Sequence, residues 1–127
     1  MRASRAFLLL LAALFALAGV PGLISIDPAV DAGINPATAD AMAEVRVIYG
    51  GLNLAFCGFF LWSCVEAPRL RSGLILAALL MATTAASRAI GVLVDGARST
   101  YQLGSLSLEL ILLIVALWLI FRRVVEN

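Results

Sequence analysis

Four ionisable side chains lie within or at the edge of long apolar segments, where a charge costs free energy unless it is paired or hydrated. They are Glu44, Arg46, Arg88 and Glu109. If each segment is a helix, Arg88 lies roughly 10 Å along its axis from Asp95, and Glu109 lies about as far from the start of the last segment. Because the two groups are then at one depth, Arg88 is predicted to pair with Glu109. Arg46 enters from the same side and is predicted to pair with Glu44 or Asp95.

Polar side chains also recur at helical spacing in three of these segments. Steps of three and four residues place them on one helix face: Arg46, Tyr49, Asn53 and Cys57; Thr84, Arg88, Gly91 and Asp95; and Gln102, Ser105 and Glu109. A bundle interior keeps such stripes away from lipid, so we predict a shared polar pocket that opens outward. The candidate ligand-binding residues are Glu44, Arg46, Tyr49, Asn53, Arg88, Asp95 and Glu109. The roles left open are binding a polar or anionic head group, forming a proton-linked path, or only fixing the register of the helices.

The composition argues against most catalytic chemistry. All nine basic residues are arginine, with no lysine and no histidine, which removes the commonest metal ligand and proton shuttle. No base stands in a motif that would activate Ser105 as a nucleophile. The two cysteines, Cys57 and Cys64, would lie roughly 10 Å apart along one helix, too far for a disulfide. We therefore expect no enzyme, no catalytic residue, no metal and no cofactor, and the net charge of +1 indicates no nucleic-acid partner.

The segments that must position these residues are four long apolar runs. The chain has 127 residues, of which 63% are hydrophobic and only 13% charged, far from the make-up of a soluble domain. The runs are Ala6 to Ile26, Val45 to Val65, Leu74 to Val94, and Leu103 to Phe121. Each has the roughly 20 residues that a helix needs to cross a bilayer. The sequence predicts an all-α fold, a four-helix transmembrane bundle that forms a single domain over residues 1–127.

The arginines predict the orientation of these helices, because cytoplasmic loops carry an excess of basic residues. Six of them lie before the first run, between the second and third, and after the fourth: Arg2, Arg5, Arg69, Arg71, Arg122 and Arg123. The first loop is acidic instead. Both termini are therefore expected in the cytoplasm, and Trp62 and Trp118 fall near that boundary, where indoles prefer to sit. An alternative stays open, that residues 1–18 are a cleaved signal peptide, although the apolar run continues to Ile26.

Three stretches resemble a bacterial family of small four-helix membrane proteins known only as a domain of unknown function. They are residues 43–52, with Glu44, Arg46, Tyr49, Gly50 and Gly51; residues 88–96, from Arg88 to Asp95 and Gly96; and residues 108–110, around Glu109. The resemblance covers nearly the whole chain. It implies a membrane bundle in the bacterial inner membrane and no mechanism, since no activity, substrate or cofactor is associated with the family.

The sequence thus favours a non-enzymatic binding or accessory bundle in the lipid bilayer. Its expected partners are a lipid-like ligand or a larger membrane complex. The alternative function is transport or proton and ion conduction by an oligomer, since four helices of one chain could assemble into a pore with other copies. Small residues such as Gly51 and Ala55 fit helix contacts within the chain or in a homo-oligomer equally well.

Overall fold

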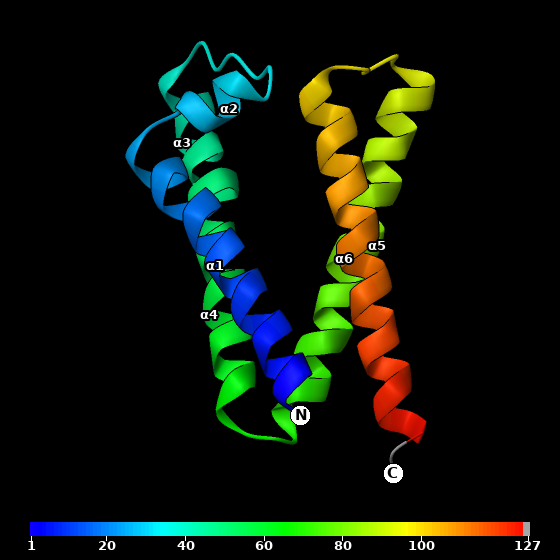
Figure 1. The fold of residues 1–127 in the computed structure, drawn as a ribbon. Helices are drawn as coiled ribbons and strands as arrows, with labels where there is room; N and C mark the ends of the chain where they lie inside the picture. Colours follow the sequence, from blue (N-terminus) through cyan, green and yellow to red (C-terminus); the bar gives the residue numbers. More distant parts are fainter. Residues whose placement is uncertain (126–127) are drawn as a thin grey trace. The chain divides into compact units, whose positions relative to one another are not determined.

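The computed structural model describes residues 1–125, and every regular element in that range is a helix. The elements fall into two compact units (Figure 1). The first unit, Met1–Ala67, holds α1 (Arg2–Ile24), α2 (Asp27–Asp31), α3 (Ala39–Val45), the π-helix η1 (Arg46–Leu52) and α4 (Asn53–Val65). The second unit begins at Pro68 and holds α5 (Arg69–Val94) and α6 (Thr100–Val125). The all-α prediction is confirmed, while the prediction of a single domain stays a prediction.

Four helices are long and apolar enough to cross a membrane, as predicted. They are Arg2–Ile24, Ala39–Val65, Arg69–Val94 and Thr100–Arg122. Each begins earlier than its apolar run, and the largest difference is in the second, which starts at Ala39 rather than Val45. Thr38 explains this start, because its Oγ1 accepts a hydrogen bond from the Ala41 amide at 3.1 Å and caps the helix. The first turns of these helices contain polar residues, so hydrophobicity alone does not show where each helix begins.

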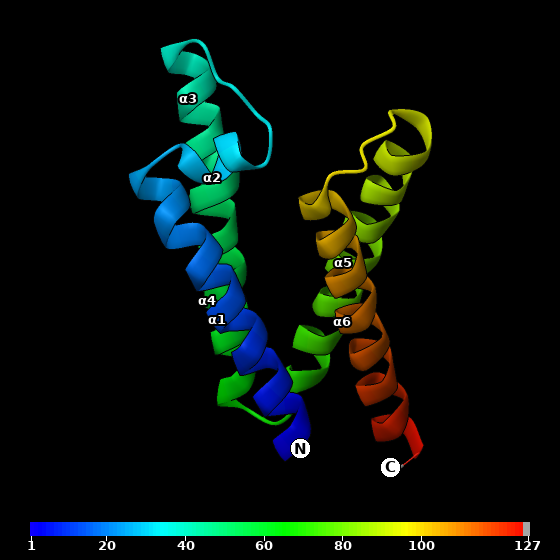
Figure 2. The same ribbon diagram turned by 45° about the horizontal axis from the view of Figure 1, so that its top comes forward.

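The first unit is a helical hairpin in which α1 runs beside η1 and α4 (Figure 1, Figure 2). Glycines bring the two backbones together. A Cβ built on Gly22 would meet the backbone carbonyl of Tyr49 far inside the 3.0 Å that real Cβ contacts respect, and one on Gly50 would lie 2.8 Å from the amide nitrogen of Leu23. Further along, the Phe15 ring packs against Phe56, with centroids 5.4 Å apart. The close approach therefore depends on Gly22 and Gly50 having no side chain.

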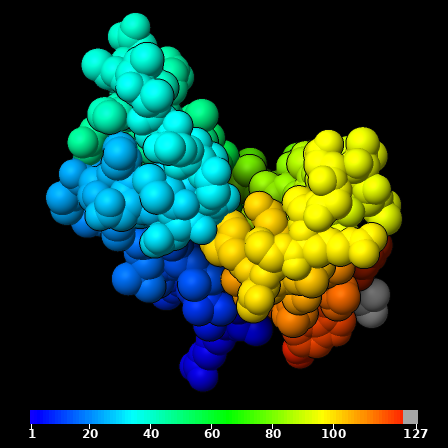
Figure 3. Space-filling view, turned by 90° about the horizontal axis from the view of Figure 1, so that it is seen from above, coloured from blue at the N-terminus to red at the C-terminus, as the bar shows by residue number. Residues whose placement is uncertain are grey.

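At one end of this unit, α2 and the loop after it lie where α1 ends and α3 begins (Figure 1, Figure 2). The view onto that end shows the cyan residues of this segment gathered over it (Figure 3). Pro28 occupies the first turn of α2, where its missing amide proton is not needed. The acidic first loop is thus folded onto its own hairpin.

The second unit is a simpler hairpin of α5 and α6 (Figure 2). Gly96, with a φ of 70°, takes the left-handed conformation that ends α5, and the Ala97 amide donates back to the Gly91 carbonyl at 3.1 Å. The Ser99 hydroxyl then accepts from the Gln102 amide at 3.2 Å and starts α6. This tight connection places the last turns of α5 directly beside the first turns of α6.

Candidate functional site

Arg88, on α5, is held by two side chains from α6. Its Nε donates to both carboxylate oxygens of Glu109, at 3.3 Å to Oε1 and 3.1 Å to Oε2, and its Nη2 lies 2.9 Å from Oε1. Its Nη1 donates to Oε1 of Gln102. The pairing of Arg88 with Glu109, predicted from their equal depth, is confirmed.

This ion pair is shielded from its surroundings. The Arg88 side chain is 21% exposed and that of Glu109 is 13% exposed. Their bidentate arrangement makes strong charge-assisted hydrogen bonds. Cζ of Arg88 also lies 5.8 Å from the centroid of the Tyr101 ring, within the range of a cation–π contact. The pair is neutral as a unit, which lowers the cost of two charges in helices that are apolar enough to cross a membrane.

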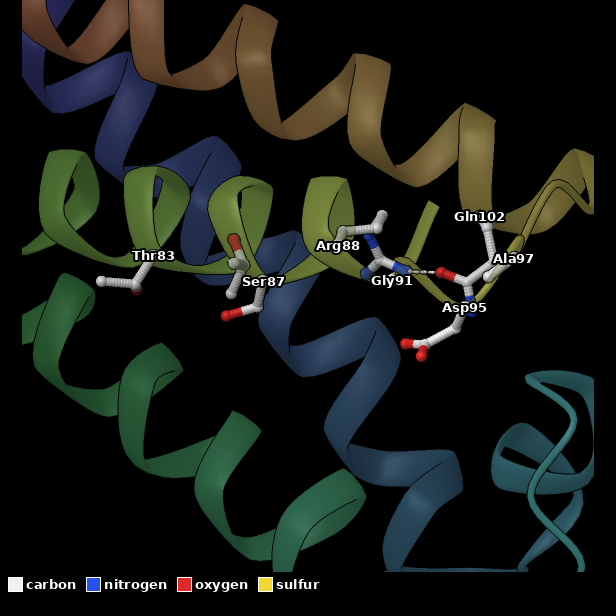
Figure 4. A pocket seen from close by; sticks show the side chains of 8 residues that line it. Thr83, Ser87, Arg88, Gly91, Asp95, Ala97 and Gln102 are labelled. Atoms are coloured by element: carbon white, nitrogen blue, oxygen red, sulfur yellow. Dashed lines mark hydrogen bonds between the residues drawn. The ribbon is translucent and has the colours of Figure 1, made fainter. Parts of the chain in front are cut away.

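A pocket of about 530 Å³ opens beside this pair (Figure 4). It is lined by Thr83, Thr84, Ser87, Arg88, Gly91, Asp95, Ala97 and Gln102. The α5 residues recur at steps of three and four, so they share the face of its last three turns. Arg88 extends toward Gln102 and is bonded to it, while no bond joins the guanidinium to the Asp95 carboxylate (Figure 4). The α5–α6 hairpin by itself therefore forms a polar pocket at its connected end.

The hydroxyls of Thr83 and Thr84 present acceptors to the pocket. The Thr83 hydroxyl donates to the Leu79 carbonyl at 2.9 Å, and that of Thr84 donates to the Leu80 carbonyl at 2.8 Å. Both hydroxyl oxygens keep their accepting lone pairs. Within the described part of the second unit, the Asp95 carboxylate accepts no hydrogen bond and forms no ion pair.

Arg46 does not pair with Glu44, the partner predicted for it within the first unit. Its Nη1 donates to the backbone carbonyl of Leu23, in the last turn of α1. Carbonyls in a last turn lack partners within the helix and carry partial negative charge, so the guanidinium caps α1. The predicted pair with Glu44 is wrong: Glu44 is exposed and forms no ion pair among the described residues. Side chains two residues apart on a helix do not face each other, and Arg46 points to α1 instead.

Asn53 donates hydrogen bonds to carbonyls of the π-helix that precedes it. Its Nδ2 donates to the carbonyls of Tyr49, at 2.8 Å, and Ile48, at 3.1 Å. A π-helix moves carbonyls away from their ordinary partners four residues on, so a side-chain amide is well suited to satisfy them. Asn53 therefore has a structural role within its own helix, and a role in ligand binding stays a prediction.

The candidate residues are thus divided between the units. Arg88, Asp95 and Glu109 lie in the second unit, where the first two line the pocket and the third holds Arg88. Glu44, Arg46, Tyr49 and Asn53 lie in the first unit. A single cluster that joins both sets, including a pair between Arg46 and Asp95, stays a prediction.

Sequence reasoning missed several residues of the site. Gln102 was placed on a polar stripe but not assigned to Arg88, although it lies seven residues, or two helical turns, before Glu109 and so shares its face. Ser87, Thr83 and Ala97 were not assigned to the pocket. Their part in the pocket follows from the turn at Gly96.

The described residues contain no cluster of side chains suited to coordinate a metal ion. No group of three or more cysteine and acidic side chains gathers in residues 1–125. Cys57 and Cys64 are both free thiols on α4, as their spacing predicted. The groups that line the site can form hydrogen bonds and charge pairs with a ligand.

Comparison with protein-family models matches residues 3–120 to a domain of unknown function, DUF4345. This match confirms the resemblance to an uncharacterised family. Comparisons with curated proteins and with solved structures find no match.

Proposed function

This chain belongs to the DUF4345 family, a domain of unknown function, and we propose that it is a non-enzymatic membrane protein that binds an amphiphile by its head group. The head group lies in the pocket lined by α5, the connection after it and Gln102 of α6, and the apolar tail lies along the outside of the hairpin. The observation that carries this proposal is the pocket of about 530 Å³ at the end of two membrane-compatible helices.

The surroundings of the pocket support an amphiphile rather than a fully polar solute. Three large apolar side chains near the same end of α5 are strongly exposed: Ile90 at 60%, Leu93 at 82% and Val94 at 76%. Exposed apolar groups next to a polar pocket match a ligand with one polar and one apolar part. Arg88 is already engaged by Glu109 and Gln102, so the pocket is built before any ligand arrives.

Filling the pocket is expected to remove the ligand without unfolding the protein. Ser87→Leu adds an apolar side chain in the pocket and breaks no hydrogen bond of the described structure. Native mass spectrometry of the protein released from lipid nanodiscs should find a lipid retained by the wild type and at least fivefold less on the variant. Ser72→Leu is the matched control, since Ser72 is exposed at the other end of α5 and outside the pocket.

Equal retention by the wild type, Ser87→Leu and Ser72→Leu would contradict the proposal. Proton or ion flux through the purified protein in liposomes, abolished by Glu109→Gln, would favour the competing function of an oligomeric conductor. A stoichiometric protein partner that survives mild solubilisation, with no retained lipid, would favour an accessory subunit of a larger complex.

We also propose that the protein spans the bacterial cytoplasmic membrane with both termini in the cytoplasm. Basic residues support this orientation: Arg69 and Arg71 begin α5, and Arg122 near the end of α6 lies 5.4 Å from the Trp118 ring, a pair suited to the membrane interface. The side chain of Arg123, the last of the six arginines, lies outside the described side chains.

Cysteine labelling tests the orientation. In a variant with Cys57→Ala and Cys64→Ala, a membrane-impermeant maleimide should label Asn35→Cys in intact bacterial cells. The same reagent should label Ser72→Cys only after the cells are made permeable. The opposite pattern would reverse the proposed orientation.

A further inference from the structure

The charges around the pocket restrict which head group it can take. Arg88 donates to Glu109 and Gln102, so its positive charge is neutralised within the hairpin. Asp95 has no described partner for its carboxylate and also lines the pocket. Of the two ionisable residues that line the pocket, Arg88 is offset by Glu109, and Asp95 has no charge partner in the described part of the hairpin.

The backbone adds to the negative charge of Asp95. Asp95 is the C-cap of α5, and the end of a helix carries a partial negative charge from its unpaired carbonyls. A carboxylate at this end is unfavourable for the helix itself, and it is stabilised by a cation nearby. An anionic head group would meet repulsion at the same place.

The threonine hydroxyls that line the pocket favour a cationic head group, as the charges do. The Thr83 and Thr84 hydroxyls donate their hydrogen bonds to carbonyls of their own helix, so each presents only an acceptor to the pocket. Oε1 of Gln102 already accepts from Arg88, which leaves the Gln102 amide nitrogen as a donor. A ligand that brings donors can bond the Asp95 carboxylate and both threonine oxygens.

We propose that the pocket selects an amphiphile whose head group carries a primary ammonium, which lies against the Asp95 carboxylate. This inference rests on the proposed function and names the class of its ligand. An ammonium group supplies one positive charge and three donors, which matches the carboxylate and the acceptors beside it. The apolar part of the same molecule then lies along Leu93 and Val94, which are exposed.

Competition among three lipids tests this assignment. Nanodiscs are made with equal amounts of phosphatidylethanolamine, with a primary ammonium, phosphatidylcholine, with a charged head that has no N–H, and phosphatidylglycerol, which is anionic. Native mass spectrometry should find phosphatidylethanolamine enriched about tenfold over phosphatidylglycerol on the released protein, as expected for one charge-assisted hydrogen bond. Asp95→Asn should reduce this ratio to about two.

Asp31→Asn is the matched control. Asp31 is also an exposed aspartate near the end of a helix, α2, but it does not line the pocket. The enrichment should survive this change. Asp95→Asn removes no described hydrogen bond, and an unchanged circular dichroism spectrum checks that the variant is folded.

The outcomes separate this inference from the proposed function. Enrichment of phosphatidylglycerol that Ser87→Leu abolishes would overturn the ammonium and leave the head-group pocket standing. Equal retention of phosphatidylcholine and phosphatidylethanolamine would overturn the need for N–H donors. Displacement of the lipid by free ethanolamine would show that the amine alone is the ligand, and retention that neither Ser87→Leu nor Asp95→Asn changes would overturn both proposals.

Discussion

Arg88→Leu is expected to lower the free energy of unfolding by about 2 to 4 kcal/mol, because it leaves the Glu109 carboxylate shielded and without its partner. The Gln102 side chain also loses the group to which it is bonded. Unfolding of the purified protein in mixed micelles, with increasing denaturing detergent, measures the change. A shift in the midpoint of this size is well resolved.

The double variant Arg88→Leu with Glu109→Leu isolates the ion pair from other effects. Both charges are then gone, and much of the lost stability should return, since an apolar pair suits the interior of a membrane hairpin. Arg71→Leu is the control, because Arg71 is exposed at the opposite end of the same helix. If the double variant is as unstable as the sum of the two single variants, the pair does not hold the hairpin together.

Gly22→Ala is expected to destabilise the first unit by about 2 to 3 kcal/mol or more. The new Cβ meets the backbone carbonyl of Tyr49, and a backbone cannot rotate away as a side chain can. Helix α1 must then move off η1, and Arg46 loses its bond to the Leu23 carbonyl. The same detergent titration measures the loss.

Gly51→Ala is the matched control for this prediction. Nothing lies within 4 Å of a Cβ at Gly51, although it is next to Gly50 on the same π-helix. Alanine is the better helix former, so stability should be unchanged or raised by up to about 1 kcal/mol. Equal damage from Gly22→Ala and Gly51→Ala would contradict the close contact between α1 and η1.

The parts of the structure that follow from the cost of burying charge in lipid were predictable from the sequence. Four apolar runs of sufficient length predicted the four spans. Arg88 and Glu109 lie at equal depth on successive helices, and an unpaired charge there is costly, so their pairing followed. Predicting these features required no knowledge of how the helices pack.

Arg46 shows where this reasoning failed. A guanidinium can be satisfied by backbone carbonyls as well as by carboxylates, and the end of α1 supplies such carbonyls. Counting acidic residues does not reveal them. The capped carbonyl belongs to Leu23, whose closeness to Arg46 depends on how α1 packs against η1.

The π-helix and the pocket could not be predicted for a related reason. Periodicity assumes 3.6 residues per turn, so it cannot show that residues 46–52 form wider turns. The pocket depends on the tight connection at Gly96 and on Thr side chains that turn back onto their own helix. Many sequences with the same polar pattern would have a different connection or different threonine rotamers.

Photo-crosslinking with a phospholipid that carries a photoreactive group beside its head group tests the central claim, a head group held in the pocket lined by α5 and Gln102. Mass spectrometry of the digested protein locates each crosslink. The account predicts that crosslinks concentrate in residues 83–102 of the wild type and are lost from that range in Ser87→Leu. Crosslinks spread evenly over the exposed apolar residues of all four helices, in both proteins, would contradict it.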